Sequence, residues 1–365
     1  MKFAILGTRG IPASYGGFET FAEELSTRLA ARGHLVTVYC RQRHPFPQYR
    51  GVRLRYLPTI RHKYLDTIAH TCLSTIALML GPKQDAALYC NAANAIFTWI
   101  PRLLRTPVAL NVDGLERHRK KWNVLAKSWY RLSEWFATWM PNAVVTDAQR
   151  IADYYQQRYR RASHMIPYGA ETGVIDSGAA LDRLGLQPRR YFLYVSRLEP
   201  ENNALLVRQA FERLATDFKL ALIGDAPYAA EYIGRVKDTR NPRVVIPGAI
   251  YGEGYRELGS HCFAYIHATE VGGTHPALLE AMGRGALTLY LDTAENAEVA
   301  AGAGIPFTHA NLEEVMRQAL EMTEAEREQW RKRAVERVRQ RYSWEAVTNA
   351  YEKLLTALAA RRQPR

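Results

Sequence analysis

The 365-residue chain has few cysteines and no long apolar run, and each shortage excludes a class of protein. Cys40, Cys72, Cys90 and Cys262 lie far apart and form no C-x-x-C pair, which argues against disulfides and a zinc site. We expect reduced core thiols in a cytosolic protein. The best membrane-span candidate, residues 68–80, has only 13 residues, so a buried or interfacial helix is expected there instead.

Acidic residues are also in short supply. The chain has 49 Lys and Arg against 36 Asp and Glu, a net charge of +13. Such a surface favours a nucleic acid, a phosphorylated small molecule or an acidic membrane face, unless the protein is merely basic. No recognised RNA- or DNA-binding module is present, and the aromatic residues are not interleaved as a stacking platform, so no nucleic-acid partner is expected.

Short apolar strands alternate with amphipathic helices along the chain. Residues 2–6 read as a buried strand, a helix follows from Phe18, and residues 35–40 form the next strand, a pattern that predicts parallel strands. The pattern breaks near residues 168–188 and then restarts, so we predict two doubly wound α/β domains. Further strands are expected at residues 86–90, 107–112, 143–147, 191–198, 219–224, 243–248, 262–268 and 286–292.

The first loop lacks the dinucleotide fingerprint, in which G-x-G-x-x-G follows a strand directly. Its glycines are Gly7, Gly10, Gly16 and Gly17, and this spacing argues against a nicotinamide-dependent oxidoreductase. No signal peptide is visible, because the first apolar residues form a strand that turns at Gly7. Gly16 and Gly17 precede a helix, where a ligand can approach the backbone and free N–H groups attract an anion; a plain glycine turn is the alternative.

The segment HATEVGGTHPALLEAM, residues 267–282, joins a strand end to a helix start. Thr274 or His275 can cap this helix, and the following proline suits its first turn. Gly272 and Gly273 expose backbone N–H groups at the positive end of the helix dipole. We therefore expect a diphosphate or a sugar hydroxyl to bind here.

Other polar residues follow strands in the second half. Glu280 lies on a mostly apolar helix, so its carboxylate predicts a hydroxyl or cationic partner. His267 and Glu270 lie where the strand 262–268 ends. Arg197 is placed to contact a diphosphate bidentately or, equally, to form a structural salt bridge.

The stretch RHRKKWNVLAKSWYR, residues 117–131, has six Lys and Arg and no acidic residue. Apolar residues recur here at helical spacing: Trp122, Leu125, Trp129, Leu132, Phe136 and Trp139. An apolar face beside cations is typical of an interfacial helix, although a core helix with a solvated basic face fits equally. The residues expected on the membrane or acceptor side are Arg117, Arg119, Lys120, Lys121, Trp122 and Trp129.

Together these segments resemble the GT-B-fold glycosyltransferases of family 4 over nearly the whole chain. GTRGIP…YGGFETF, NVDGLERHRKKW (residues 111–122), RLEPENN and HATEVGGTHPALLEAM are similar to the subgroup that includes bacterial rhamnosyltransferases of polysaccharide assembly. The resemblance implies an acceptor domain (1–170) and a nucleotide-sugar donor domain (171–345) that face each other across a cleft. It implies that a last helix, 346–365, crosses back to the first domain.

The resemblance also implies roles for individual residues. Arg197 is expected to neutralise the donor diphosphate and Glu280 to bind the nucleotide ribose. The expected donor-binding residues are Gly16, Gly17, Arg197, Asn202, Gly248, Tyr251, Gly272, Gly273, Thr274 and Glu280. The expected catalytic residues are Asp113, His267 and Glu270.

Three positions depart from the usual family pattern. Gly272 stands where the wider family has glutamate, Asn202 where it has lysine, and Asp113 where many relatives have histidine. We expect His267 and Glu270 to replace the lost sugar contacts. These departures match the rhamnosyl-type subgroup and argue against a simple UDP-glucose or GDP-mannose donor.

The predicted reaction needs only a stabilised leaving group. Arg197, the helix N-terminus and the glycine loop can stabilise a nucleotide diphosphate, and no acidic pair lies in a donor loop, so no metal or other cofactor is expected. The resemblance implies retention of configuration by same-face attack, with a donor phosphate oxygen taking the proton. Asp113 orients the sugar or acceptor or acts as a base; its alternative is a turn residue before Gly114.

We therefore predict a retaining hexosyltransferase that moves L-rhamnose from dTDP-rhamnose to a lipid-linked glycan acceptor in bacterial polysaccharide assembly. Its expected place is cytoplasmic, peripheral on the inner face of the cell membrane. A nucleotide-sugar epimerase of the same fold, a family 4 transferase that uses a UDP or GDP sugar, and a non-catalytic sensor of nucleotide sugars are the alternatives.

Overall fold

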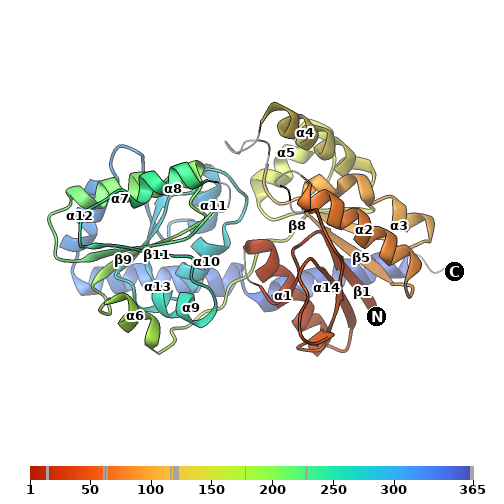
Figure 1. Ribbon diagram of the computed structural model, residues 1–365, viewed down its shortest axis with the longest axis horizontal. Coiled ribbons are helices and arrows are strands. Elements are labelled where there is room, and N and C mark those ends of the chain that lie inside the picture. The colour runs from red at the N-terminus through yellow and green to blue at the C-terminus, as the bar shows by residue number, and fades with distance from the viewer. Residues whose placement is uncertain are drawn as a thin grey trace. The chain divides into compact units, whose positions relative to one another are not determined.

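The computed structural model describes residues 1–13, 16–60, 62, 65–115, 117, 123–176, 178–226 and 229–361. The chain folds into two compact units, each around its own sheet (Figure 1). The first unit contains the described residues before Gly169 together with those from Trp344 onward, and the second contains Gly169–Ser343. The first unit is thus built from two separate parts of the chain.

The first unit has an eight-stranded sheet in the order β3-β4-β2-β1-β5-β6-β7-β8. The pairing of β3 with β4 is antiparallel, and the other neighbours are parallel. The first strand lies inside the sheet and the chain winds outward from it in both directions, which is a doubly wound topology. The strands are β1 (Lys2–Leu6), β2 (Leu35–Cys40), β3 (Gln48–Tyr49), β4 (Val52–Tyr56), β5 (Ala86–Cys90), β6 (Val108–Asn111), β7 (Ala143–Thr146) and β8 (His164–Met165).

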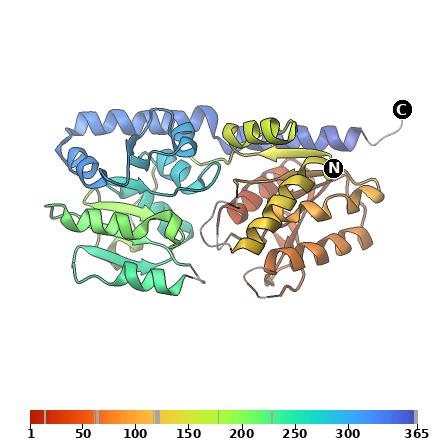
Figure 2. The ribbon, with the colours of Figure 1, turned by 90° about the horizontal axis from the view of Figure 1, so that it is seen from above.

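Helices cover both faces of this sheet (Figures 1 and 2). The C-terminal helix α14 contacts α1 and β5. Its fully buried Tyr351 packs against Phe21, with ring centroids 5.1 Å apart, and the Tyr351 hydroxyl accepts a 2.8 Å hydrogen bond from the Asn111 side chain. The helices are α1 (Gly17–Ala31), α2 (Asp66–Leu80), η1 (Ala92–Phe97), α3 (Ile100–Leu103), α4 (Val124–Trp139), α5 (Gln149–Tyr159) and α14 (Trp344–Ala360).

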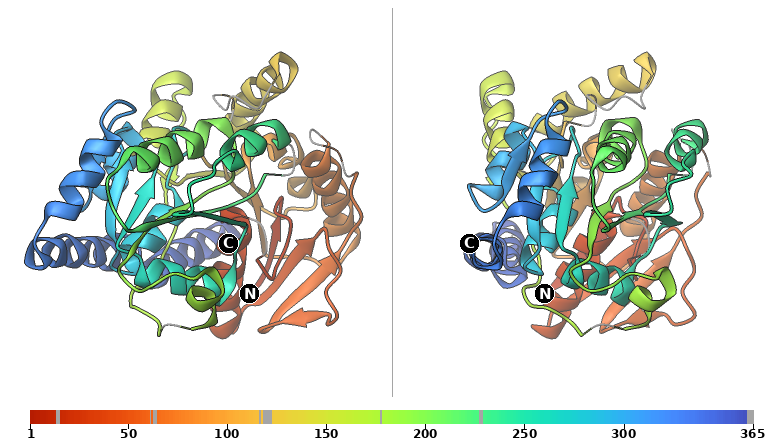
Figure 3. Two further views of the ribbon diagram at one scale, coloured as in Figure 1. Left: turned by 60° about the vertical axis from the view of Figure 1, so that its left-hand side comes forward. Right: turned by 90° about the vertical axis from the view of Figure 1, so that its left-hand side faces the viewer.

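The second unit has a six-stranded parallel sheet in the order β11-β10-β9-β12-β13-β14 (Figure 3). Here too the first strand lies inside the sheet and later strands are added on both sides. The strands are β9 (Tyr191–Val195), β10 (Lys219–Ile223), β11 (Val244–Gly248), β12 (Ala264–His267), β13 (Leu287–Leu291) and β14 (Ile305–Phe307).

Two cores lie on opposite faces of the second sheet. One packs α7, α8 and α12 against it, and the other packs α6, α9 and α10. The helical elements are α6 (Ala179–Leu184), η3 (Pro200–Asn202), α7 (Ala204–Arg213), α8 (Ala230–Lys237), α9 (Gly252–His261), α10 (Pro276–Gly283), α11 (Ala294–Ala300), α12 (Leu312–Glu321) and α13 (Glu324–Arg341).

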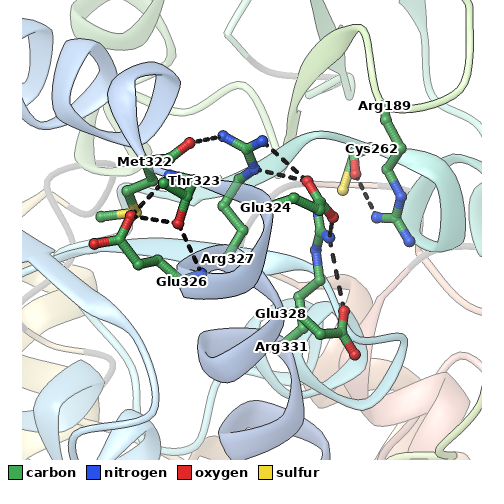
Figure 4. A network of polar contacts seen from close by, with 9 residues as sticks. All are labelled: Arg189, Cys262, Met322, Thr323, Glu324, Glu326, Arg327, Glu328 and Arg331. Carbon is green, nitrogen blue, oxygen red and sulfur yellow. Dashed lines mark hydrogen bonds and ion pairs between the residues drawn. The ribbon is translucent and has the colours of Figure 1, made fainter.

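The start of α13 is fixed by a polar network (Figure 4). Thr323 and Glu326 form a capping box, in which each side chain accepts a hydrogen bond from the other residue's backbone N–H. Glu324 pairs with Arg327 and with the buried Arg331. Ala334 and Val338 of α13 are buried, and the helix contacts α10 and β13.

The predicted fold class, two doubly wound α/β domains, is confirmed. Each predicted strand overlaps a strand of the structure, because strands of a parallel sheet are buried on both faces and read as short apolar runs. The prediction missed β3, β4, β8 and β14, which are short strands at or near sheet edges and carry exposed or half-buried residues.

Candidate active site

In each unit several of the predicted site residues follow the strands at which the strand order reverses. This switch point is between β1 and β5 in the first unit and between β9 and β12 in the second. Ligands of doubly wound sheets bind beyond the carboxyl ends of the strands at this point. The loops that leave these strands are therefore the candidate binding segments of the two units.

The loop after β1 needs glycine for steric reasons. At Gly7 (φ +90°) a Cβ atom would lie 2.3 Å from the Cys90 carbonyl oxygen at the end of β5. At Gly10 (φ +105°) it would lie 2.6 Å from the Cys40 side chain. These two glycines let the loop pass close to neighbouring strand ends, which is a structural role.

Two carboxylates of α1 hold the same loop. Glu19 accepts a 2.9 Å hydrogen bond from the Arg9 backbone N–H, and Glu23 accepts a 2.6 Å one from that of Ala13. Burial raises the pKa of Glu19, an effect that the Arg9 hydrogen bond opposes. The sequence analysis did not predict that Glu19 and Glu23 bind the loop backbone. Acidic residues in the first two turns of a helix that follows a glycine loop could have indicated it.

Gly16 and Gly17 form the entrance to α1. Gly16 is the extended N-cap residue, and its carbonyl accepts the backbone N–H groups of Glu19 and Thr20. No side chain caps this end. A Cβ atom at Gly16 would make only an ordinary 3.5 Å contact with Glu19, so packing alone does not require glycine here.

Asp113 lies just beyond β6 in the left-handed conformation (φ +58°), which Asp tolerates better than most residues. Its backbone N–H donates a 3.0 Å hydrogen bond to the Asn111 side chain, which in turn donates to Tyr351. Burial raises the pKa of Cys90, and the negative charges of Glu19 and Asp113 raise it further. The carboxylates of Glu19 and Asp113 therefore both lie close enough to the end of β5 to raise the pKa of the Cys90 thiol.

In the second unit, the loop after β9 presents Arg197. Its side chain is about one-third exposed, and its guanidinium lies 3.9 Å from the Glu199 carboxylate, a loose ion pair. The buried Asn202 donates a 2.6 Å hydrogen bond to the Arg197 carbonyl, and its own carbonyl accepts one from Tyr194. Asn202 thus braces the loop through its amide, and Arg197 supplies the charge.

Glu270 connects the loops that follow β9 and β12. Its backbone N–H donates to the Glu201 carbonyl at 3.0 Å. Its carboxylate accepts a 3.0 Å hydrogen bond from the Asn203 amide and lies 3.1 Å from His309 Nε2. Asn203 also donates to the Ala268 carbonyl. This shared carboxylate holds the two loops in register.

His267, His275 and Gly272 form a compact group at the end of β12. His267 is buried, and burial lowers its pKa to about 3, so its ring is neutral near pH 7. The rings of His267 and His275 lie 4.8 Å apart. A Cβ atom at Gly272 would lie 2.4 Å from His275 Cε1. The His275 ring therefore fills the space that any side chain at position 272 would need.

The helix α10 begins directly after His275, whose side chain forms no capping hydrogen bond at the helix N-terminus. One turn further, the half-buried Glu280 lies beside two partners. Burial raises the pKa of Tyr255, and Glu280, hydrogen-bonded to its hydroxyl, raises it further; Glu280 also acts on Arg284. The predicted hydroxyl and cationic partners are thus found within the protein. A carboxylate has about four lone-pair sites, so these partners orient Glu280 without saturating it.

Four other residues are expected from the sequence to bind the donor. Gly248 (φ +94°) ends β11, and its carbonyl accepts a 3.0 Å hydrogen bond from Gly224. The ring of Tyr251, before α9, is 51% exposed. Thr274 and Gly273 are buried beside the start of α10.

Only part of the basic segment, residues 117 and 123–131, belongs to the described residues. Arg119, Lys120, Lys121 and Trp122 lie outside the described residues. Arg117 donates 2.9 Å hydrogen bonds to the buried Glu134 and to the Tyr154 hydroxyl. Its charge is therefore used inside the first unit. Trp129 is half-buried on α4.

Comparison with known families defines the class of protein. Residues 16–169 match the model of the glycosyl transferase 4-like domain, and residues 182–337 match that of glycosyl transferases group 1. The chain is therefore a glycosyltransferase.

More particularly, the two matches make it a glycosyltransferase of the family 4 type, with the 4-like domain first and the group 1 domain second. The predicted enzyme class is thus confirmed. No curated protein matches the chain in sequence.

Solved structures share the fold at low identity. Sucrose-phosphate synthase from Thermosynechococcus elongatus is 18% identical with a TM-score of 0.80, over 98% of this chain and 99% of that one. HepE from Anabaena, in complex with UDP-glucose, is 16% identical with a TM-score of 0.77, over 98% and 100%. WaaG, a glycosyltransferase involved in lipopolysaccharide biosynthesis, is 17% identical with a TM-score of 0.71, over 98% and 99%. These likenesses show the GT-B fold.

Proposed function

We propose that this glycosyltransferase transfers a 6-deoxyhexose, with L-rhamnose from dTDP-rhamnose as the preferred donor, to a lipid-linked glycan acceptor in cell-surface polysaccharide assembly. The proposed reaction retains the anomeric configuration and uses no metal. The observation that carries the proposal is the grouping at the switch point of the second unit. There the loop after β9 carries Arg197, and the loop after the neighbouring β12 leads into α10, which carries Glu280.

The donor diphosphate is assigned to the positive groups of this site. Arg197 and the N-terminal N–H groups of α10 stabilise the charge that develops on the leaving diphosphate. Glu280, oriented by Tyr255 and Arg284, accepts hydrogen bonds from the ribose hydroxyls. The exposed Tyr251 and the turn at Gly248 border the base. HepE, whose structure holds UDP-glucose, supports a nucleotide sugar as the donor class.

The preference for a deoxysugar is argued from the group around Gly272. Position 272 has no carboxylate, and the ring of His275 and the neutral ring of His267 occupy this part of the loop. A wall without a carboxylate suits a sugar carbon that bears a methyl group rather than a hydroxyl, because a polar group buried without a partner is destabilising. Glu270 remains as an acceptor for a sugar hydroxyl.

In the proposed chemistry the acceptor hydroxyl attacks on the face from which the diphosphate leaves. The bond between the anomeric carbon and the phosphate oxygen breaks, the new glycosidic bond forms, and a donor phosphate oxygen takes the acceptor proton. Asp113, held by Asn111, orients the acceptor or the sugar. Gly16 and Gly17, at the entrance to α1, are assigned to donor binding.

The donor is tested by thermal shift with dTDP-rhamnose, UDP-glucose, UDP-GlcNAc and GDP-mannose. A ligand at 100 times its Kd adds about 2.7 kcal/mol, which shifts the Tm by several degrees. Stabilisation by dTDP-rhamnose is expected; stabilisation by only a UDP or GDP sugar rejects the rhamnose donor. Glu280→Ala is expected to abolish the shift, and Glu231→Ala, on an exposed position of α8, to preserve it.

A nucleotide-sugar epimerase of the same fold is the second candidate, since it shares the fold and a diphosphate site. Incubation with a labelled nucleotide sugar, with and without membrane lipid from a polysaccharide-producing bacterium, distinguishes the two. Label that moves into lipid supports transfer. Conversion of the donor sugar without acceptor supports the epimerase and rejects transfer.

A further inference from the structure

The helix α4 turns its large apolar side chains toward solvent. Val124 and Leu125 are 78% and 79% exposed, and Leu132, Trp135 and Trp139 are 42%, 49% and 51% exposed. They lie on one side of the helix, and the rings of Trp135 and Trp139 lie 5.3 Å apart. A surface helix ordinarily turns its apolar side to the core, so α4 is oriented for a partner outside its own unit.

The buried side of α4 holds two polar residues beside Tyr130 and Ala137. Ser133 and Glu134 are buried, and Glu134 is held by Arg117, Tyr154 and Tyr159. Because a buried carboxylate with these partners is strongly favoured over an unpaired one, the network fixes which side of the helix faces outward. The outward apolar side is therefore a built feature of the fold.

Two neighbouring helices continue this surface. The helix α2 contacts α3, and Arg102 of α3 donates to the carbonyl groups of Trp139 and Met140 at the end of α4. The three helices lie on the same side of the sheet (Figure 1). The exposed large apolar residues here are Leu73, Ile76, Leu80, Trp99, Leu103 and Leu104.

The same surface carries charge of one sign. In the described residues 66–115, 117 and 123–139, every exposed charged side chain is cationic: Lys83, Arg102, Arg105, Lys127 and Arg131. The acidic residues of these ranges are half-buried or buried: Asp66, Asp85, Asp113 and Glu134. Lys127 and Arg131 lie on α4 itself, at the edge of its apolar side.

We propose that the outward faces of α2, α3 and α4 are a docking surface for an anionic lipid bilayer. Exposed Trp and Leu side chains enter the boundary between headgroups and acyl chains, and the surrounding cations attract anionic headgroups. A second copy of the chain fits this surface poorly, because a two-fold contact would bring like charges together. In the described residues no helix is both long enough and apolar enough to cross a membrane.

This proposal rests on the proposed function, because a lipid-linked acceptor would bring the enzyme to a bilayer. It deepens that function by naming the surface that contacts the lipid. It also assigns the membrane contact to residues other than the six expected from the sequence, including Trp135 and Trp139 of α4. Arg117 supports the helix from inside, and the exposed residues of α4 make the contact.

The test is sedimentation of the full chain with sucrose-loaded vesicles of phosphatidylcholine, alone or mixed with phosphatidylglycerol. Binding is expected only to the mixed vesicles and to weaken with salt. Loss of two large apolar contacts in Trp135→Ser/Trp139→Ser is expected to weaken partitioning at least about tenfold. Lys127→Glu/Arg131→Glu is expected to weaken it about tenfold as well. Phe46→Ser, which removes an exposed aromatic residue before β3, is the matched control and is expected to bind normally.

Folding and donor binding are followed in the same variants. The thermal shift with dTDP-rhamnose is expected to stay unchanged in the Trp135/Trp139 and Lys127/Arg131 variants, because neither pair lies in the donor unit. If the vesicles bind wild type and both variants alike, the surface is misassigned. If wild type binds no vesicles, or self-associates through this face in sedimentation velocity, the bilayer is the wrong partner. A chain that binds vesicles but no nucleotide sugar refutes the proposed function and leaves the docking surface standing.

Discussion

The contact between Gly272 and His275 makes a sharp steric prediction. Gly272→Ala places a methyl group 2.4 Å from His275 Cε1, well inside any real contact distance. The ring cannot move freely, because it is buried and packs 4.8 Å from the ring of His267. Overpacking of this kind destabilises by about 1–3 kcal/mol. We therefore expect Gly272→Ala to destabilise the second unit by about 2 kcal/mol.

Removal of the ring should reverse this effect. In the background of His275→Ala, the same Gly272→Ala substitution has space and is expected to change stability by less than about 0.5 kcal/mol. The coupling between the two positions is then about 1–3 kcal/mol. Gly234→Ala is the matched control, because Gly234 lies inside α8 with no atom within 4 Å of its added Cβ. There the substitution should stabilise by up to about 1 kcal/mol.

Scanning calorimetry of the four combinations at positions 272 and 275 measures this coupling, and the thermal shift with dTDP-rhamnose follows donor binding in parallel. A neutral Gly272→Ala variant would refute the steric reasoning. Equal destabilisation with and without the His275 ring would show that position 272 needs glycine for another reason. In either case position 272 would no longer support a pocket wall formed by the rings of His267 and His275.

Three further predictions concern other parts of the molecule. Arg117→Ala leaves the buried Glu134 without its cation and should destabilise the first unit by about 3–5 kcal/mol, whereas Glu134→Gln in that background should recover part of the loss in a urea titration. The unfolded His267 takes a proton near pH 6.5 and the folded one only near pH 3, so the free energy of unfolding decreases as the pH falls between these values. The variant His267→Gln should show a flatter dependence of the unfolding free energy on pH in that range. Thr323→Ala removes one half of the capping box with Glu326 and should cost about 1 kcal/mol in the thermal transition of the second unit.

The sequence predicts the fold well because burial on both faces makes each central strand a continuous apolar run. It also predicts that Glu280 has a hydroxyl or cationic partner, since a carboxylate on an apolar helix needs one, and Tyr255 and Arg284 interact with it. Strands at or near the sheet edges, such as β4 (Val52–Tyr56), escaped prediction, because half-exposed strands mix charged and apolar residues.

Other features depend on contacts that no local pattern contains. The stripe of Trp and Leu on α4 is visible in the sequence, but its outward direction follows from the pairing of Glu134 with Arg117 on the opposite side. The binding of the glycine loop by Glu19 depends on how the loop folds back over its helix. Likewise, the reason for glycine at 272 is a side chain three residues later.

The division of the chain has a consequence for how the protein is made. The second unit is one continuous segment, Gly169–Ser343, whereas the first unit is completed only by Trp344 and the residues after it. Until α14 has left the ribosome, Tyr351 is missing from the first unit. Phe21 then lacks the ring that packs against it, and Asn111 lacks its hydrogen-bond acceptor. The second unit can therefore finish folding before the first, the reverse of the usual order of synthesis. A truncated gene that ends before residue 344 would yield a first unit with an open core.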